Sequence, residues 1–366
     1  MASSISLPAF SNLASNILNP DGTTIDQSFA PVNGSMFRNR IINGNFDIWQ
    51  RATSHSANGY GSADRWQLEV SGTTGTMSRQ LFTLGQTDVP NNPTYFSRHV
   101  VSSVAGASNN YVMRQNIENV SSYAGQTVTI SFYAKADAAK PVSVQAAQYF
   151  GSGGSPSATV QVTGVKRTLS TSWARYSVQL AIPSISGKVL GTDNGDCLQI
   201  KVWMDAGSSF DARTDTLGQQ SGTFEFSGVQ IEAGSSATRF EIRPIGLELS
   251  LCQRYYYRPG WNSPSTTYLL GFGFAESATL ASLNFWTPVE MRVAPTVGSS
   301  GAVTLALATY AGSGITISSI PSTTFNGTMG GLLVVRITAS GMTAGVPCAL
   351  SKFNSTTQYI DFSAEL

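Results

Sequence analysis

Charged residues are scarce in this chain. Lys and Arg number 22 and Asp and Glu number 21 among 366 residues, so 12% of the chain is charged and the formal net charge is +1. Ordinary globular proteins are about 25% charged. No three basic residues stand in a row, so the basic footprint of a nucleic-acid-binding protein is missing. No run of about 18 apolar residues occurs either, and we expect no membrane-spanning helix.

Histidine and cysteine are also rare. The two histidines, His55 and His99, have no second His or Cys at the spacing of a zinc site. The three cysteines are odd in number and far apart, at Cys197, Cys252 and Cys348. This pattern favours small buried hydrophobic side chains over a disulfide framework, and it fits synthesis in a reducing cytosol.

The usual catalytic motifs are missing. No G-x-S-x-G, H-E-x-x-H or G-x-x-x-x-G-K-[ST] pattern occurs. Two pairs of acids, Asp193/Asp196 and Asp211/Asp215, lie in loops rich in Gly and Thr and leave one route to glycoside hydrolysis. Loop acids of this kind commonly shape turns, so we predict a protein that is not an enzyme.

Residues 1–35 differ from the rest of the chain. No basic residue precedes Arg38, so no signal peptide is predicted. The segment is too short to bury a core alone and is either a solvated tail or an extended arm that docks on a partner. We favour an anchoring arm because it carries five large apolar side chains: Leu7, Phe10, Leu13, Ile17 and Leu18.

Residues 36–243 have the pattern of one β domain. Thr127–Lys135 alternates apolar and polar side chains, as a strand with one buried face does. Three further runs repeat this signal, and the stretches between them are rich in turn residues. No repeat of fixed length is present, so a two-sheet sandwich is favoured over a propeller.

A short helix and a second β region follow. Pro244 suits the first turn of a helix and Pro259 its end, so residues 244–259 are predicted as a helical linker, although the alternating leucines from Leu247 also permit a strand. Residues 260–366 contain short strand candidates punctuated by prolines and are long enough for one small β-sandwich.

One stretch, Arg38–Arg51, combines an Asn43-Gly44 turn with apolar residues on both sides. We predict a strand leading into this turn. Trp49, and Trp66 further along, lie among apolar neighbours and are predicted to be core residues, as is Trp173.

Several segments together resemble bacteriophage virion fibre and tail proteins that carry a carbohydrate-binding-module-like jelly roll. The resemblance covers about residues 36–258 and is carried by Arg38–Arg51, Ala63–Trp66, Tyr123–Lys135, Trp173–Val178, Gly228–Gly234 and Arg239–Tyr256. It implies an all-β fold with a jelly-roll β-sandwich, a short helical linker and a second small β-sandwich. It also implies a structural or adhesive virion component without enzyme activity, commonly a trimer.

The resemblance and the residue chemistry give four groups of candidate residues. Leu247, Leu251, Tyr255 and Tyr256 are candidates for a homo-oligomer interface, because threefold fibres bury apolar stripes along their axis. Aromatic rings suit the C–H faces of sugars, and the candidates for glycan contacts are Trp261 and Tyr268. Carbohydrate-binding modules of this type can hold a structural Ca²⁺ between their first and last strands, and the matching positions are Asn45, Asp47 and Glu232. The fourth group is the anchoring arm.

The leading hypothesis is a short fibre or tail appendage on the virion exterior, made in the host cytoplasm. In this hypothesis the arm contacts other virion proteins and the distal domain contacts host-surface glycans. One alternative is a capsid decoration or head-fibre protein with a purely structural role. The other alternative is a virion-associated polysaccharide depolymerase.

Overall fold

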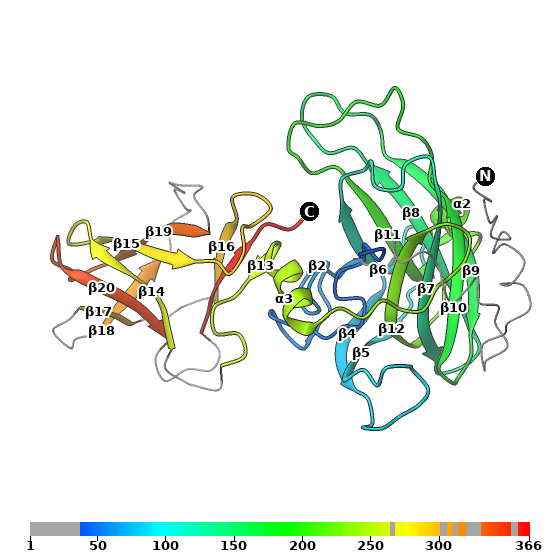
Figure 1. Ribbon diagram of the computed structural model, residues 1–366, viewed down its shortest axis with the longest axis horizontal. Helices are drawn as coiled ribbons and strands as arrows, with labels where there is room; N and C mark the ends of the chain where they lie inside the picture. Colours follow the sequence, from blue (N-terminus) through cyan, green and yellow to red (C-terminus); the bar gives the residue numbers. More distant parts are fainter. Residues whose placement is uncertain (1–36, 264–267, 301–305, 310–313, 320–330, 353–357) are drawn as a thin grey trace, which may run out of the picture.

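The computed structural model describes residues 37–263, 268–300, 306–309, 314–319, 331–352 and 358–366. Two β domains lie next to each other and are connected through helix α3 and strand β13 (Figure 1). The five residues predicted to anchor the arm, Leu7, Phe10, Leu13, Ile17 and Leu18, lie outside the described residues.

The larger domain is a sandwich of two six-stranded antiparallel sheets. The first has the strand order β1-β4-β5-β12-β7-β10, and the second has the order β2-β3-β6-β11-β8-β9. Strands distant in sequence pair as neighbours, and the all-β jelly-roll prediction is confirmed. The strands are β1 (Ser54–His55), β2 (Gly59–Tyr60), β3 (Gln67–Ser71), β4 (Thr74–Leu81), β5 (Tyr95–Ser102), β6 (Asn110–Glu118), β7 (Thr127–Ala136), β8 (Lys140–Tyr149), β9 (Val160–Leu169), β10 (Ala174–Ala181), β11 (Cys197–Ala206) and β12 (Gly222–Ala233).

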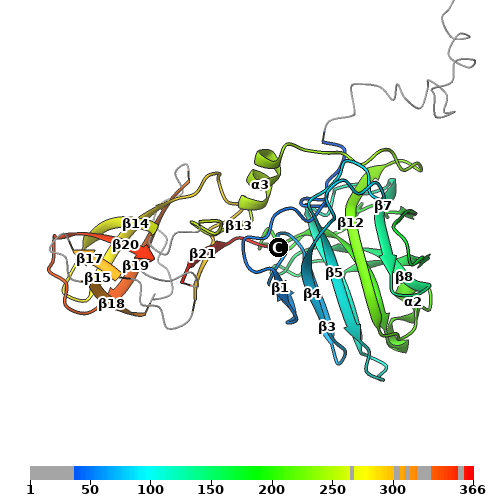
Figure 2. The ribbon, with the colours of Figure 1, turned by 90° about the horizontal axis from the view of Figure 1, so that it is seen from below.

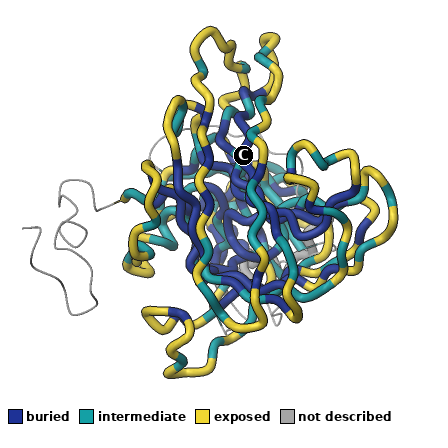
Figure 3. The backbone as a smooth tube through the Cα atoms, turned by 90° about the vertical axis from the view of Figure 1, so that its right-hand side faces the viewer, coloured by how far each residue is buried: buried dark blue, intermediate teal, exposed yellow. Residues whose placement is uncertain are grey.

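The two sheets share one core because their strands alternate. Val128, Ile130 and Phe132 of β7 point inward and are fully buried, and Phe224 and Phe226 of β12 join them. Successive side chains of a strand point to opposite faces, so the residues between these positions form the outer face of the sheet. Figure 3 shows the buried residues concentrated in the middle of the molecule and the exposed residues in the outer loops.

The second domain contains a closed barrel and not the small sandwich that we expected. The barrel strands follow the order β14-β15-β19-β18-β17-β20 and leave no open sheet edge. Gly273 permits the close approach of β14 to β15, because a Cβ there would clash with the Ser282 carbonyl oxygen. The barrel strands are β14 (Tyr268–Ala275), β15 (Leu280–Trp286), β17 (Ala306–Thr309), β18 (Gly314–Ser319), β19 (Leu332–Ala339) and β20 (Pro347–Lys352).

A three-stranded sheet, β13-β21-β16, lies between the barrel and the sandwich (Figure 2). It consists of β13 (Tyr256–Tyr257), β16 (Thr296–Ser299) and β21 (Ile360–Ser363). The predicted helical linker is thus part helix and part strand, since α3 spans Ile245–Gln253 and β13 follows it. Two short elements on the sandwich, η4 (Ser208–Phe210) and α2 (Asp211–Thr214), are the other described helices, and none of the three could cross a membrane.

The Arg38–Arg51 stretch contains the predicted turn but no strand. Asn43 adopts a left-handed φ of 57°, and the Phe46 backbone N–H donates to the Asn43 carbonyl. The Asn43 amide donates to the carbonyls of Ile48 and Asp64, and the Trp66 indole donates to the Asn43 carbonyl. These bonds replace the ladder of a strand and hold the turn inside the domain. Trp66 is fully buried, as predicted.

We predict that Gly44→Ala destabilises the sandwich. Gly44 lies against β12, where its carbonyl accepts from the Val229 backbone N–H, and a Cβ at this position would collide with the Val229 carbonyl oxygen. Overpacking of this kind typically costs about 1–3 kcal/mol, which denaturant unfolding would measure. Gly246→Ala is the matched control: nothing lies near its added Cβ in α3, so it should be neutral or raise stability by about 0.5–1 kcal/mol. Equal effects of both changes would contradict this account of the turn.

Candidate functional site

An open depression lies on the outer face of the first sheet of the sandwich. Its volume is about 480 Å³, which falls in the range of roughly 300–1,000 Å³ typical of small-ligand sites. We call it the sandwich depression, and its lining residues are Arg98, Val100, Lys135, Ala136, Asp137, Thr171, Thr223 and Glu225.

Three charged side chains cross the depression in one row. Glu225 of β12 pairs in register with Arg98 of β5 on one side and with Lys135 of β7 on the other. Its buried carboxylate lies 2.6 Å from the Arg98 guanidinium and 3.1 Å from the Lys135 ammonium. The row therefore has a net charge of +1. Both cations remain about one-third exposed, so each can donate further hydrogen bonds to a ligand.

An aromatic cluster borders this row. The Trp173 ring, just before β10, lies 5.6 Å from the Lys135 ammonium. It packs edge-on against Phe96, with ring centroids 5.3 Å apart, and against Phe82 at 5.2 Å. Trp173 is half-buried rather than enclosed, so the prediction that it is a core residue is wrong: its supporting rings lie on the outer face of the sheet.

Polar groups complete the surface of the depression. Thr171 and Thr223 contribute hydroxyls, and the Asp137 carboxylate accepts from the Thr223 backbone N–H at 3.0 Å. Sugars are recognised by a ring that contacts C–H groups and by charged or polar groups that bind hydroxyls. The depression offers the charged and polar groups, and Trp173 at its border offers the ring. The carboxylates of Glu225 and Asp137 are already paired with Arg98, Lys135 and the Thr223 backbone. The depression is therefore suited to binding a ligand through its exposed cations and hydroxyls.

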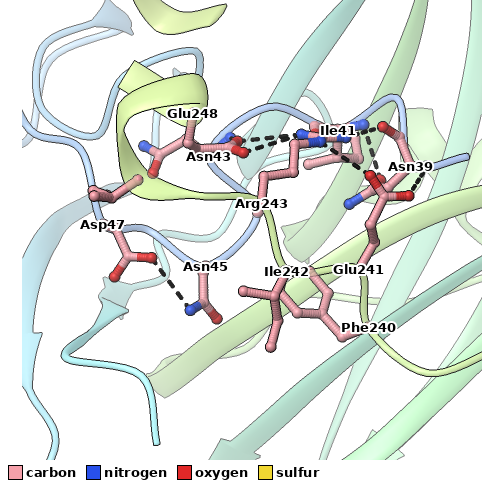
Figure 4. A pocket seen from close by; sticks show the side chains of 12 residues that line it. Asn39, Ile41, Asn43, Asn45, Asp47, Phe240, Glu241, Ile242, Arg243 and Glu248 are labelled. Carbon is pink, nitrogen blue, oxygen red and sulfur yellow. Dashed lines mark hydrogen bonds and ion pairs between the residues drawn. The ribbon is translucent and has the colours of Figure 1, made fainter. Parts of the chain in front are cut away.

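A second, much smaller cavity lies where α3 meets the Asn43 turn (Figure 4). Its volume is about 30 Å³, enough for about one or two water molecules. Arg243 crosses it and forms ion pairs of 3.2 Å with Glu241 and with Glu248, the acid of the first turn of α3. The Arg243 guanidinium also donates to the Ile41 carbonyl at 3.0 Å. This cluster fastens α3 to the start of the sandwich.

Two of the three calcium candidates line this cavity, and the third does not. The Asn45 amide donates to Asp47 at 3.3 Å, whereas Glu232 accepts from the Thr238 backbone N–H and hydroxyl and pairs with Arg38 at 3.6 Å. Asn45, Asp47 and Glu232 are therefore not gathered into one ligand set. Across the described part of the chain, no three His, Cys, Asp or Glu side chains are placed to hold a metal ion.

Two of the four interface candidates are buried inside the chain itself. Tyr255 lies under the Arg65 guanidinium, 3.5 Å from the ring centroid, and Tyr256 lies under Arg51 at the same distance. Both rings thus pack between the chain's own two domains. Of the other two candidates, Leu247 is exposed and Leu251 is half-buried, and an interface through α3 stays a prediction for these two alone.

The predicted glycan contacts lie outside the sandwich depression. Trp261 is half-buried in a turn closed by its backbone N–H and the Arg258 carbonyl. Tyr268 begins β14, and its side chain is outside the described residues. Sequence reasoning missed Arg98, Lys135 and Glu225, because they come from three strands that only the strand order makes neighbours. The one available signal was that each of them occupies an outward position in a strand whose side chains alternate between the two faces of the sheet.

We predict that Asp47→Asn removes a pH dependence of stability. Burial raises the pKa of Asp47 to about 6, and Glu248 adds to the rise while the Asn45 hydrogen bond opposes it. The folded state therefore holds the Asp47 proton more tightly than the unfolded chain. The proton on Asp47 therefore stabilises the folded state below about pH 4. This stabilisation is lost as the pH rises to about 6, which lowers the free energy of unfolding by up to about 3 kcal/mol.

The free energies of unfolding of wild type and Asp47→Asn should therefore diverge between pH 4 and 6, with the variant more stable at pH 7. Denaturant titrations across this range measure the difference. Asp88→Asn, at an exposed aspartate of the sandwich, is the control and should follow wild type. A constant offset between wild type and Asp47→Asn would rule out the titration of this carboxyl.

Comparison with known proteins gives similarity in fold only. No protein-family model matches the chain, and no curated protein sequence matches it. Among solved structures, a family 4 carbohydrate-binding module is 18% identical and a family 11 module from Clostridium thermocellum is 10% identical. They cover 52% and 51% of this chain and each 98% of their own, with TM-scores of 0.30.

A domain of a tailspike protein from bacteriophage CBA120 is also similar. It is 12% identical, covers 54% of this chain and 22% of its own, and has a TM-score of 0.30. At these scores the three structures carry no argument about function. The support for a function therefore comes from the residues of the site.

Proposed function

We propose that this chain binds a glycan in the sandwich depression. The observation that carries the proposal is the Trp173 ring beside the Arg98–Glu225–Lys135 row: a half-buried aromatic ring borders an open depression that holds two partly exposed cations. The ring would contact the apolar face of a sugar. The cations and the nearby threonine hydroxyls would bind its hydroxyl groups.

We further propose that this binding serves adhesion on a virion exterior. The support for this setting is the sequence resemblance of residues 36–258 to phage fibre and tail proteins. In this proposal residues 1–35 anchor the chain to other virion proteins, and the two β domains extend outward as a short appendage. A decoration protein would have the same anchor without glycan affinity, and a depolymerase would release reducing sugar from host polysaccharide.

The glycan site predicts a selective effect of Trp173→Ala. Loss of the aromatic contact at the border of the depression should weaken glycan binding by about tenfold or more, measured on a glycan array and then by calorimetry with the best-bound glycan. Circular dichroism would confirm that the variant is folded. Trp261→Ala is the matched control and should bind as wild type does. Binding that depends on Trp261 instead would move the site to the second domain, and a protein that binds no glycan would favour the decoration role.

If residues 1–35 are the anchor, incorporation into particles can be lost without loss of folding. Deletion of residues 2–35 should leave the sandwich folded, because its described core begins with Ile41, but should prevent incorporation into particles. Immunoblotting of purified virions measures incorporation, and glycan binding by the truncated protein is the internal control. Normal incorporation of the truncated protein would disprove the anchor and leave the glycan site unaffected.

A further inference from the structure

The barrel has a large exposed aromatic surface that the glycan site does not use. Phe272 and Phe274 of β14 are 53% and 51% exposed, and Trp286 of β15 is 59% exposed. Side chains of this size are normally found inside a domain. Most monomers have no contiguous apolar patch beyond a few hundred Å², so three such rings on one domain require an explanation.

Strand register shows that these rings belong to one surface. Phe272 pairs with Asn284 on β15, and Trp286 lies two residues beyond Asn284 on the same face, so the two rings are diagonal neighbours. Across the next strands, Asn284 pairs with Val334 of β19, and Phe272 pairs with Ala349 of β20. We call this four-strand surface the aromatic face of the barrel.

The two described charged groups of the aromatic face are paired with each other, and the Asn284 amide is the polar group beside the rings. Ser282 donates to Glu276, and the Glu276 carboxylate pairs with Arg336 at 3.1 Å. Among its described side chains the face therefore has no net charge, and its large exposed side chains are hydrocarbon for the most part. A glycan would need several hydrogen-bonding groups between the rings, whereas the residue that the register places beside both Phe272 and Trp286 is Asn284, which offers one amide. Phenylalanine rings have no polar group of their own.

We infer that the aromatic face binds a second copy of this chain. Self-association brings identical surfaces together, and a charged surface would repel its copy, whereas a neutral hydrocarbon surface is complementary to itself. The partner must pack face to face, because every barrel strand is paired on both sides and no edge is open for strand addition. In Figure 1 the barrel projects away from the sandwich, which leaves room for a second barrel.

The exposed area supports this assignment. Three half-exposed aromatic side chains of about 200 Å² each offer roughly 300 Å² of apolar surface. A stable interface buries about 800 Å² on each partner, with its most apolar part at the centre. The aromatic face is the right size for that centre, and the flanking strands would supply the rim. This interface is separate from the α3 residues Leu247 and Leu251.

Sedimentation velocity of the full chain over a range of concentrations tests the inference. We expect wild type to self-associate and the double variant Phe272→Ser/Trp286→Ser to associate more than about tenfold more weakly. Its melting temperature should stay close to that of wild type, because both rings are exposed. Leu84→Ser is the control, since Leu84 is 92% exposed on the sandwich and should not affect association.

A labelling experiment tests the same contact in a protein that is folded before the label is attached. The three native cysteines are buried, so Asn284→Cys introduces an accessible thiol in the middle of the aromatic face. A polyethylene glycol maleimide attached to this folded protein should keep it monomeric. The same label on Leu84→Cys should leave the oligomer intact.

Three results would overturn the inference. They are a wild type that stays monomeric at every concentration, a double variant that associates as wild type does, and an oligomer that survives the label at Asn284→Cys. If the wild type is monomeric and the double variant loses glycan binding, the aromatic face is a glycan surface instead. The outcome is independent of the proposed function, because Trp173→Ala alters the sandwich depression and should leave self-association unchanged.

Discussion

A buried arginine fixes the two domains to each other. Arg65 of the sandwich is 1% exposed, and a charge buried this deeply is costly unless it is paired. Its guanidinium forms an ion pair with Glu365 and donates to the Asn116 carbonyl at 2.6 Å, while the Tyr255 ring lies against its face. Tyr255 lies in the connection just before β13, whereas Glu365 lies beyond β21 in the second domain. Two of the contacts of Arg65 therefore exist only while the second domain is docked, and undocking would break its ion pair with Glu365 and its contact with the Tyr255 ring.

The same arrangement is repeated around the junction. Arg51 pairs with Glu365 at 3.1 Å and lies over the Tyr256 ring, and the Tyr255 hydroxyl donates to Glu118 of the sandwich at 2.7 Å. Directional contacts of this kind fix an orientation more strictly than apolar packing does. They explain why the tyrosines face inward. Sequence reasoning placed them on an outer surface because a run of tyrosines does not reveal the arginines that cover it.

The sequence predicted the fold well where a local pattern decides it. The alternation in Thr127–Lys135 predicted β7, and Pro244 predicted the start of α3. The barrel was not predicted, because closure depends on which strands pair at the end of the sheet, and short strands broken by prolines fit a sandwich equally well. Trp173 was misjudged for a related reason: its apolar neighbours Phe82 and Phe96 lie on the outer face, and residue type alone does not distinguish the two faces of a sheet.

The candidate site was beyond sequence reasoning because its residues are assembled by topology. Arg98 and Glu225 are separated by more than a hundred residues, yet β5 and β12 are neighbours and place the two side chains in register. The calcium candidates show the reverse situation, since Asn45 and Glu232 match a pattern in sequence but have different partners in the fold, and the calcium site stays a prediction.

The fixed docking of the two domains links the aromatic face of the barrel to the sandwich depression. If copies of the chain join through the barrel, the junction at Arg65 holds each sandwich depression at a fixed angle to that contact. Several depressions would then face a glycan-bearing surface together, and the second binding event becomes effectively intramolecular. A flexible linker would lose part of this gain, because each depression would have to be reoriented before it could bind. On the proposed function, weak single contacts at open depressions would together support firm adhesion, because the ion pairs between the domains restrain each depression from rotating.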